Sequence, residues 1–403
     1  MRAMKDSGVE WIGEIPQEWS LIRTKYIASI TNGSDPKTEG NVPVYGSGDG
    51  SFKSCGEYKD GPAVLLGRKG ATLHIPHYVS GKYWNVDTAF DVKMVSDRFD
   101  LKYYYALSTC FDYKYYTSTT TLPSMTQTNY GNMYLPFPSR AEQSRIIAFI
   151  ETRCAEIDAL IAAKEKTNAL LKEHRQSIIY EAVTKGLDPT APMKDSGVDW
   201  IGEIPEEWSV RRLKVLAELR TGSTPTTGKQ EYFEGDINWF TPGDFSDNLY
   251  LTQSERTLSQ IAANDGVVSL FDSDSILLIA IGATVGKVGL LKVPAYSNQQ
   301  ITAITLNEKK RAEYYAYWLQ AAAPSIQATA NYTTLPIINN AHLAETLCPF
   351  VEDEKIQMEI ATYLKEQCDC IDKLVDKNKD TIRKLKEYRQ SLIYEAVTGK
   401  IEV

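Results

Sequence analysis

The chain has 403 residues, which is enough for two domains of ordinary size and the segments that connect them. Hydrophobic residues make up 43% of it, but no apolar run approaches the roughly 20 residues that would span a membrane, which excludes an integral membrane protein. The formal net charge of −8 excludes a generally basic nucleic-acid-binding module, so any contact with nucleic acid needs local patches or basic partners.

The first residues, MRAMKDSGVEW, contain no apolar signal segment. The six cysteines are scattered and form no CxxC spacing. Both features favour a protein of the reducing cytoplasm without structural disulfides.

Two pairs of near-identical segments divide the chain. The leaders are MKDSGVEWIGEIPQEW at 4–19 and MKDSGVDWIGEIPEEW at 193–208, and the back repeats are LKEHRQSIIYEAVT at 171–184 and LKEYRQSLIYEAVT at 385–398. The leaders are 189 positions apart and the back repeats 214, so the second variable block is 25 residues longer than the first. Weaker matches late in the blocks place most of this insertion between Trp208 and Gly282.

In the first block, an apolar run ends in the glycine-containing segment LLGRKGAT at 65–72. Glycine lets the backbone approach phosphate closely, and Arg68 and Lys69 supply positive charge, so a turn that contacts DNA is one interpretation. A plain hairpin turn with solvated charges is the other, and the sequence leaves both open. Further along, Tyr103, Tyr104 and Tyr105 follow helical spacing, which predicts a core helix.

A run of hydroxyl side chains closes the first block just before a Leu-Pro pair. Thr119, Thr120 and Thr121 can hydrogen-bond phosphates or base edges, although such runs are often plain exposed loops. The block then passes into a long helix. Ser139 and Glu142 have capping-box spacing, apolar residues recur every 3.5 to 3.6 positions, and Gly186 is a natural terminator.

The second block follows the same order. Apolar runs flank a turn that contains Gly282, Thr284 and Lys287, and candidate DNA-contacting side chains follow at Asn298, Gln299, Asn331, Tyr332 and Thr333. Asn298 and its neighbours could equally cap a buried strand. Tyr314, Tyr315 and Tyr317 repeat the predicted core helix, and a second long helix with matching apolar spacing ends near Gly399.

Two long helices with matching apolar stripes should bury them against each other, and antiparallel pairing brings the N terminus near the C terminus. Each helix would have about 45 residues and a length of roughly 65 Å. The predicted fold class is α+β, with two mixed α/β domains, two long antiparallel helices and a pseudo-two-fold, circular internal repeat. The expected boundaries are 1–140 and 189–350 for the domains, and 141–188 and 351–403 for the helices.

Several segments that imitate catalytic motifs fail on inspection. Residues 282–288, GATVGKV, have three residues between the glycines instead of the four of a Walker loop, and Val288 stands where Ser or Thr must meet Mg²⁺. His74 and His77 lack neighbouring carboxylates or cysteines, and Cys368 and Cys370 point apart on a helix. An ATP site and a metal site are therefore not expected. A methyltransferase active site is not expected either, because no Asn-Pro-Pro or Asp-Pro-Pro loop ending in an aromatic residue is present and no convincing GxGxxG follows a strand.

This order of parts resembles the specificity subunits of Type I restriction-modification systems. The resemblance covers nearly the whole chain and rests on the leaders, the LPFPSRAEQSRI junction at 135–146 and the back repeats. The second junction is weaker, since only Gln357 and Ile360 match Gln143 and Ile146.

The resemblance implies that residues 1–140 and 189–350 are target-recognition domains, each reading one half of a bipartite, asymmetric target in double-stranded DNA. It implies two copies of a DNA adenine methyltransferase subunit and additional restriction subunits as partners. S-adenosylmethionine, ATP and Mg²⁺ would then belong to those partners, with no cofactor, metal or catalytic residue on this chain.

The back repeats also share charged positions, which packing alone would not explain. This favours two equivalent docking sites on the outer face of the helices, although recent duplication would leave the same trace. The candidate docking residues are Arg175, Gln176, Glu181, Arg389, Gln390 and Glu395. Two rival functions stay open, a coiled-coil scaffold without a DNA role and a self-contained DNA methyltransferase or nuclease.

Overall fold

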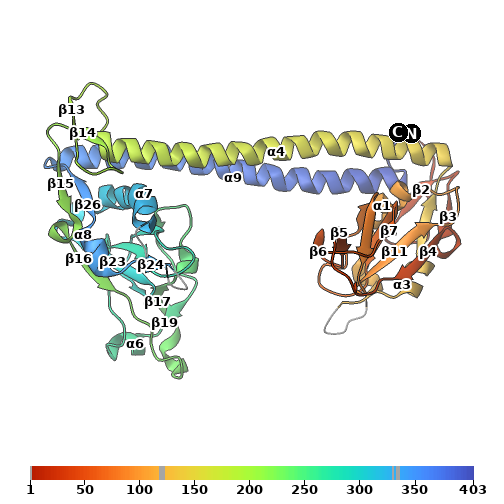
Figure 1. Cartoon of the computed structure of the whole chain (residues 1–403), viewed down its shortest axis with the longest axis horizontal. Coiled ribbons are helices and arrows are strands. Elements are labelled where there is room, and N and C mark those ends of the chain that lie inside the picture. Colours follow the sequence, from red (N-terminus) through yellow and green to blue (C-terminus); the bar gives the residue numbers. More distant parts are fainter. Residues whose placement is uncertain (1, 118–122, 329–330, 333–335) are drawn as a thin grey trace. The chain divides into compact units, whose positions relative to one another are not determined.

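The computed structural model describes residues 2–117, 123–328, 331–332 and 336–403. Two compact units contain the chain, unit 1 with Met1–Glu165 and Lys379–Val403, and unit 2 with Lys166–Asn378. Each unit combines one mixed α/β domain with part of α4 (Arg140–Lys185) and part of α9 (Glu354–Thr398) (Figure 1). The expected boundaries separate the domains from the helices, whereas each unit contains both.

The long helices have the lengths and ends that the sequence predicts. They contain 46 and 45 residues, and Gly186 and Gly399 follow them with φ of +77° and +74°. The capping box is half formed. The backbone N–H of Glu142 donates to Ser139 Oγ at 3.3 Å, but the Glu142 carboxylate accepts from Trp19 Nε1 at 3.0 Å and pairs with Arg2 at 2.6 Å. A partner distant in sequence has replaced the local one.

The described part of unit 1 contains two four-stranded sheets and two short strand pairs, β1 (Met4–Asp6) with β2 (Glu14–Pro16) and β3 (Ser20–Arg23) with β12 (Tyr134–Phe137). The first sheet has the order β6 (Ser51–Cys55), β5 (Val42–Tyr45), β10 (Lys82–Asn85), β7 (Lys59–Asp60). The second has the order β4 (Ala28–Asn32), β11 (Ala89–Met94), β8 (Ala63–Gly67), β9 (His77–Val79). The remaining elements are η1 (Thr24–Tyr26), α1 (Leu101–Ser108), α2 (Tyr113–Tyr116) and α3 (Gln127–Asn132).

Unit 2 has a five-stranded sheet and a three-stranded sheet. Their orders are β16 (Ala217–Thr221), β23 (Ile301–Leu306), β20 (Ile276–Ile279), β21 (Val288–Leu291), β18 (Tyr250–Leu251), and β19 (Thr257–Leu258), β17 (Phe233–Phe240), β22 (Tyr296–Ser297). The helices are α5 (Leu213–Leu216), α6 (Gln260–Asn264), α7 (Ala312–Ala328), α8 (Asn340–Glu345), η2 (Gln230–Tyr232), η3 (Pro242–Asp244) and η4 (Lys309–Arg311). Short strand pairs are β13 (Met193–Asp195) with β14 (Glu203–Pro205), β15 (Ser209–Arg212) with β26 (Leu347–Phe350), and β24 (Asn331–Tyr332) with β25 (Pro336–Ile337).

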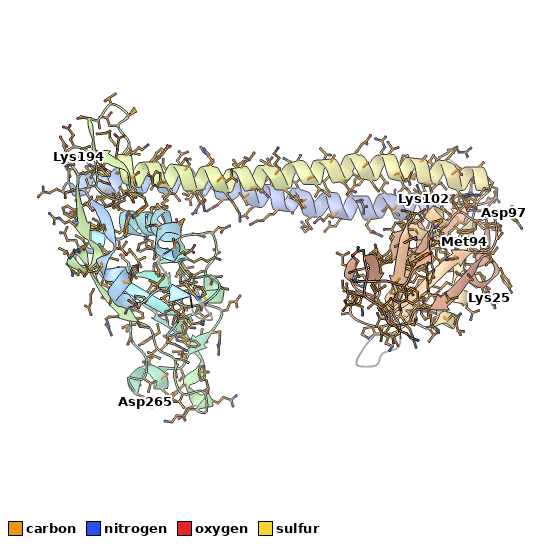
Figure 2. All side chains as sticks on the ribbon, viewed as in Figure 1. Lys25, Met94, Asp97, Lys102, Lys194 and Asp265 are labelled. Atoms are coloured by element: carbon orange, nitrogen blue, oxygen red, sulfur yellow. The ribbon has the colours of Figure 1, made fainter. Side chains whose placement is uncertain are left out.

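Most of the additional residues of the second variable block lie in one region. Gly33 of unit 1 lies against the backbone carbonyl of Asn85, at the end of a strand, and Gly222 of unit 2 lies in the same way against that of Ser297. The two glycines are 189 positions apart. Those strand ends are 212 positions apart. The additional residues therefore lie between Gly222 and Ser297, where unit 2 has α6. In Figure 2, Asp265, which follows α6, lies at the end of unit 2 far from the long helices.

The tyrosines of α1 and α7 are core residues as predicted, except for Tyr105, which is partly exposed. Tyr103, Tyr104, Tyr314, Tyr315 and Tyr317 are almost fully buried. The Tyr103 hydroxyl donates to the carbonyl of Val397 in α9 at 2.7 Å, and the Tyr314 hydroxyl donates to that of Val183 in α4 at 3.0 Å. In each unit, the tyrosine hydroxyl thus connects the domain to the end of a long helix by a hydrogen bond. Lys102, at the start of α1, lies beside the helices in Figure 2 and pairs with Glu151 of α4 at 2.5 Å.

Each leader packs on the end of a long helix. In unit 1 the Tyr394 hydroxyl of α9 donates to the carbonyl of Ile12 at 3.1 Å, and in unit 2 the Tyr180 hydroxyl of α4 donates to that of Ile201 at 3.0 Å. The first leader therefore lies against the C-terminal back repeat, although almost the whole chain separates them in sequence. The two termini lie near each other in unit 1, as antiparallel pairing predicts (Figure 1).

The two helices run antiparallel inside each unit, and polar contacts accompany their apolar packing. In unit 1 Arg389 of α9 pairs with Asp158 of α4 at 3.1 Å. In unit 2 Arg175 of α4 pairs with Asp372 of α9 at 3.8 Å, and Asn378 donates to Asn168 at 2.8 Å. The two Arg–Asp pairs occupy equivalent positions, 214 residues apart. Among the described residues no helix is both long and apolar enough to cross a membrane.

Candidate nucleic-acid interface

Each unit contains a glycine-centred turn after a fully buried strand, and the two turns share the backbone conformation of the central glycine. Glycine loop 1 comprises residues 68–72 after β8, and glycine loop 2 comprises residues 280–287 between β20 and β21. Gly70 and Gly282 have φ of +116° and +115°, a conformation that residues with a Cβ rarely adopt. The turn between two antiparallel strands that the sequence predicted around Gly282 is confirmed.

The two loops are held by equivalent hydrogen bonds. The N–H groups of Gly70 and Gly282 donate to the carbonyls of Pro123 and Pro336, at 3.1 and 3.2 Å. Each proline belongs to a Thr-Leu-Pro segment that the sequence matched between the blocks.

Two further backbone bonds recur around the residue two positions before each glycine. The carbonyls of Arg68 and Ala280 accept from Met125 and Ile338, at 2.9 and 2.8 Å. The backbone N–H groups of Arg68 and Ala280 donate to the backbone carbonyls of Thr88 and Gln300, both at 2.7 Å. The fold therefore brings together three segments that are far apart in sequence.

The basic side chains of glycine loop 1 are already engaged within unit 1. The Arg68 guanidinium donates to the backbone carbonyl of Asp87 at 3.2 Å and lies 5.9 Å from the ring of Phe90. Lys69 Nζ lies 3.3 Å from the Asp87 carboxylate, and both side chains are about half exposed. The loop thus presents positive charge to solvent, but Asp87 offsets part of it.

Glycine loop 2 presents fewer charges. Thr284 is exposed, and the exposed Lys287 donates through Nζ to the carbonyl of Phe245 at 3.2 Å. Asn298 is 8% exposed and exchanges hydrogen bonds with Gln300, whose N–H donates to Asn298 Oδ1 at 3.1 Å. These bonds lie just before β23 begins at Ile301, so they agree with the alternative that Asn298 caps a buried strand. Gln299 is exposed and accepts a hydrogen bond from the Thr224 hydroxyl.

Several candidates from the sequence cannot be placed further. Thr119, Thr120, Thr121 and Thr333 lie outside the described residues, and Asn331 and Tyr332 lie on β24. His77 lies on β9 and its Nε2 is 2.7 Å from the carbonyl of Gly48, whereas His74 is exposed in the preceding turn. Within the described ranges, no three His, Cys, Asp or Glu side chains are grouped as metal ligands.

The candidate docking residues divide into engaged and exposed side chains. The outer-face expectation is wrong for Arg175, whose side chain is 13% exposed because it lies against Asp372 and donates to the carbonyl of Asp247 at 2.9 Å. Burial raises the pKa of Asp372 despite the Arg175 charge, which fits a loose ion pair. Arg389 pairs with Asp158, and Gln390 donates to the carbonyl of Thr109 at 2.8 Å.

The other docking candidates leave more surface free. Gln176 and Glu181 are exposed on α4, and Glu395 is partly exposed and accepts from the Ser391 hydroxyl at 3.1 Å. A lysine contact also links this region to the domain of unit 2. Lys172 pairs with Asp247 at 2.9 Å, and its hydrogen bond lowers the pKa of that carboxyl.

A cavity lies beside each back repeat. The cavity in unit 2, about 350 Å³, is lined by Arg175, Gln176, Ile179, Lys287 and residues of α7. The cavity in unit 1, about 210 Å³, is lined by Arg389, Ile393, Cys154 and residues of α1. Arg175 and Ile179 correspond to Arg389 and Ile393 in the back repeats, so the two cavities occupy related places in their units.

Residues 205–384 match the family model of the Type I restriction modification DNA specificity domain. The similarity to a Type I specificity domain thus lies in the second half of the chain. The resemblance to the specificity subunits of these systems is therefore confirmed. The matched range covers the domain of unit 2 and most of α9.

Curated relatives are similar over part of their length. The Type I restriction enzyme MjaIX specificity subunit of Methanocaldococcus jannaschii is 31% identical over 176 residues, which cover 43% of this chain and 40% of that protein. The HindI specificity subunit of Haemophilus influenzae is 26% identical over 212 residues, covering 51% and 46%. The chain thus aligns with less than half the length of either relative.

A solved structure shares the fold over nearly the whole chain. It comes from a study of complex assembly and conformational transition of the type I R-M system, and its TM-score is 0.72 over 96% of this chain and 99% of that chain. The sequence identity of 16% shows likeness of fold alone. The chain therefore shares the mixed α/β fold with two long helices of that structure.

Proposed function

We propose that this chain reads DNA sequence within a Type I restriction-modification complex, with each unit recognising one half of a bipartite, asymmetric target. The observation that carries the proposal is the repeated glycine loop, in which one backbone arrangement presents different side chains in the two units. Backbone and basic groups can position a reader on phosphates, and the variable side chains around them can contact base edges. Two readers with different side chains suit a target with two different halves.

Catalysis in this proposal belongs to partner subunits. Two copies of a DNA adenine methyltransferase would supply S-adenosylmethionine chemistry, and restriction subunits would supply ATP-dependent cleavage. The cost of flipping the target adenine, a few kcal/mol, would then be met in the methyltransferase. This chain supplies target recognition and is itself non-catalytic.

The repeats support a circular arrangement of two modules. Leader 2 follows the first back repeat along the chain and packs on it through Tyr180 and Ile201, and leader 1 packs on the C-terminal back repeat through Tyr394 and Ile12. We infer that each module consists of a back repeat, a leader, a variable block and the start of a long helix. Two equivalent modules suit two copies of one partner.

Exposed leucines in equivalent positions indicate where that partner docks. Leu160 of α4 is 54% exposed and Leu374 of α9 is 46% exposed, and they are 214 residues apart. The internal ion pairs account for the recurrence of Arg175 and Arg389, but they do not account for two exposed apolar side chains. We therefore centre each docking surface on one of these leucines, with the cavity beside each back repeat as a second contact.

The recognition proposal is tested with the chain purified alone and together with its methyltransferase subunit. Methylated adenines are mapped genome-wide in a host that carries the system, and duplexes with the mapped or a scrambled sequence then compete for binding at fixed salt. We expect a bipartite methylated sequence, preferential binding of its duplex, and no methyl transfer by the chain alone. Methyl transfer without a partner, or binding that ignores sequence, contradicts the proposal.

The docking surfaces are tested by native mass spectrometry. Leu160→Asp and Leu374→Asp should each reduce the number of bound methyltransferase subunits from two to one, because a charge replaces the apolar contact. Leu170→Asp is the matched control, since Leu170 is 55% exposed on the same helix but its repeat counterpart is Lys384. Retention of two subunits by both variants would exclude these surfaces.

A further inference from the structure

The turn between β5 and β6 contains three glycines, and the fold requires two of them. Gly50 has φ of +76°, and a Cβ at Gly46 would lie 2.9 Å from the Thr88 hydroxyl. Gly48 has neither feature, because its φ lies outside the left-handed range and a Cβ there would meet no atom within 4 Å. The backbone at Gly48 is therefore open to close approach by another molecule.

An aromatic side chain is displayed beside this turn by a β-bulge. Ser51 and Lys53 of β6 pair with Tyr45 and Val44, so Phe52 between them has no partner on β5. A bulge bends its strand and re-aims the unpaired side chain. The Phe52 ring lies against the bare Cα of Gly46, 3.5 Å from where a Cβ would be, and the side chain stays 60% exposed.

The turn adjoins glycine loop 1. A Cβ at Gly70 would lie 3.1 Å from Ser47 Oγ, and the carbonyl of Gly48 is 2.7 Å from His77 Nε2 just beyond the loop. The Lys53 ammonium lies 5.4 Å from the centre of the Phe52 ring. The exposed ring, the open glycine backbone and the basic side chains of the loop thus form one continuous surface of unit 1.

We propose that Phe52 stacks on or inserts between bases of the half-site read by unit 1, while the backbone at Gly48 approaches the adjacent sugar-phosphate chain. This inference rests on the proposed function. Aromatic side chains stack on any base, and apolar side chains inserted at a base step kink the duplex. Phe52 is then a specificity-determining residue, since unstacking a base step costs an amount that depends on its sequence.

Among the described residues of unit 2, no exposed phenylalanine ring lies at the corresponding place. β17 pairs in parallel with β22 as β5 pairs in parallel with β10. Phe240 at the end of β17 and Phe245 in the segment that follows are both buried, at 0% and 6% exposed. The stacking contact therefore belongs to one half-site, which makes the two halves of the target distinguishable.

The experiment uses the full chain with its methyltransferase subunit and a duplex of the mapped target that carries 2-aminopurine, a fluorescent adenine analogue, in one half-site or the other. Wild type should raise 2-aminopurine fluorescence in one half-site only, because unstacking relieves quenching. Phe52→Ala should abolish that rise and weaken binding of the target roughly tenfold, the scale of one stacked base, whereas Phe52→Trp should retain both. Gly48→Ala should keep the melting temperature of wild type and still weaken binding.

Tyr26→Ala is the control, because Tyr26 is 65% exposed and its neighbour Lys25 lies on the opposite side of unit 1 from β5 and β6 (Figures 1 and 2). Its binding should equal that of wild type. Phe52→Ala binding within twofold of wild type, or a loss of methyltransferase binding instead of DNA binding, would overturn the inference. If wild type itself shows no preference for the target, the proposed function fails, and that outcome is distinct from failure at Phe52 alone.

Discussion

At the scale of single residues, the charges near the candidate interface are arranged in opposed pairs. Lys69 faces Asp87 in glycine loop 1, and Lys172 and Arg175 hold Asp247 beside the unit 2 cavity. Such pairs contribute little to stability when exposed, about 0 to 1 kcal/mol. Their effect on the affinity for DNA is larger, because each carboxylate repels the phosphates and competes with them for the paired lysine.

Removal of the Asp87 charge should therefore strengthen DNA binding. We expect Asp87→Asn to raise affinity for target and scrambled duplexes alike, by several-fold at low salt, and to steepen the dependence of affinity on salt by roughly one phosphate contact. Titrations at a series of salt concentrations check this. A gain in affinity for the target alone would show that Asp87 contacts bases. If the affinity does not change, Lys69 is not part of the interface.

Asp100 couples the start of α1 to the start of α4 and should make unit 1 sensitive to acid. Partial burial acts to raise the pKa of Asp100, but its hydrogen bonds from Arg140 and from the N–H groups of Lys102 and Tyr103 outweigh burial and lower it. A carboxyl with a lowered folded-state pKa stabilises the fold fully above its unfolded pKa of about 3.9, and this contribution is lost as pH falls through the folded-state value.

Asp100→Asn keeps a good N-cap and removes the charge. We expect it to lower the free energy of unfolding by up to about 1 kcal/mol at pH 7, and to bring wild type and variant together as pH falls below 4. Urea denaturation from pH 7 to pH 3 measures both. A difference that stays constant across that range would show that the charge of Asp100 contributes nothing.

At the scale of elements, the sequence predicted the two long helices, the two core helices and the turns at glycine. Capping, periodicity and terminal glycines located both long helices, and apolar runs around glycine located the turn between β20 and β21, because these signals act within a few residues of each other. The bulge at Phe52 left no such signal. It depends on how β6 meets β5 and on the bare surface of Gly46, which no short window of sequence contains.

The tyrosine hydroxyls that fasten α1 and α7 to the long helices should each stabilise their unit. Tyr103→Phe and Tyr314→Phe leave a buried helix-end carbonyl without its donor, so each should lower the free energy of unfolding by about 1 kcal/mol. Tyr104→Phe is the control, because among the described residues its hydroxyl forms no hydrogen bond with α9. Equal effects at Tyr103 and Tyr104 in thermal denaturation would mean that packing, not the hydrogen bond, fastens α1.

At the scale of the whole molecule, we expect the variable blocks to be exchangeable. Replacing residues 20–138 with the block of a related specificity subunit should change one half of the methylated sequence and leave the other half unaltered, because leader 1 and α4 still supply the surface on which the block packs. Mapping methylated adenines in a host with the hybrid system checks this. A change in both halves would contradict modular reading.

The sequence by itself determined that the chain repeats, where the first long helix begins, where both long helices end, and where buried strands turn at glycine, because short-range physics dictates each of these. Only the tertiary structure decided which recurring charged residues are paired within the chain. Arg175 and Arg389 read as surface residues until the antiparallel helices placed Asp372 and Asp158 opposite them. It also seated leader 1 on the C-terminal back repeat and exposed Phe52 beside glycine loop 1. Contacts between segments hundreds of residues apart depend on how the elements pack, and no local pattern in the sequence specifies that.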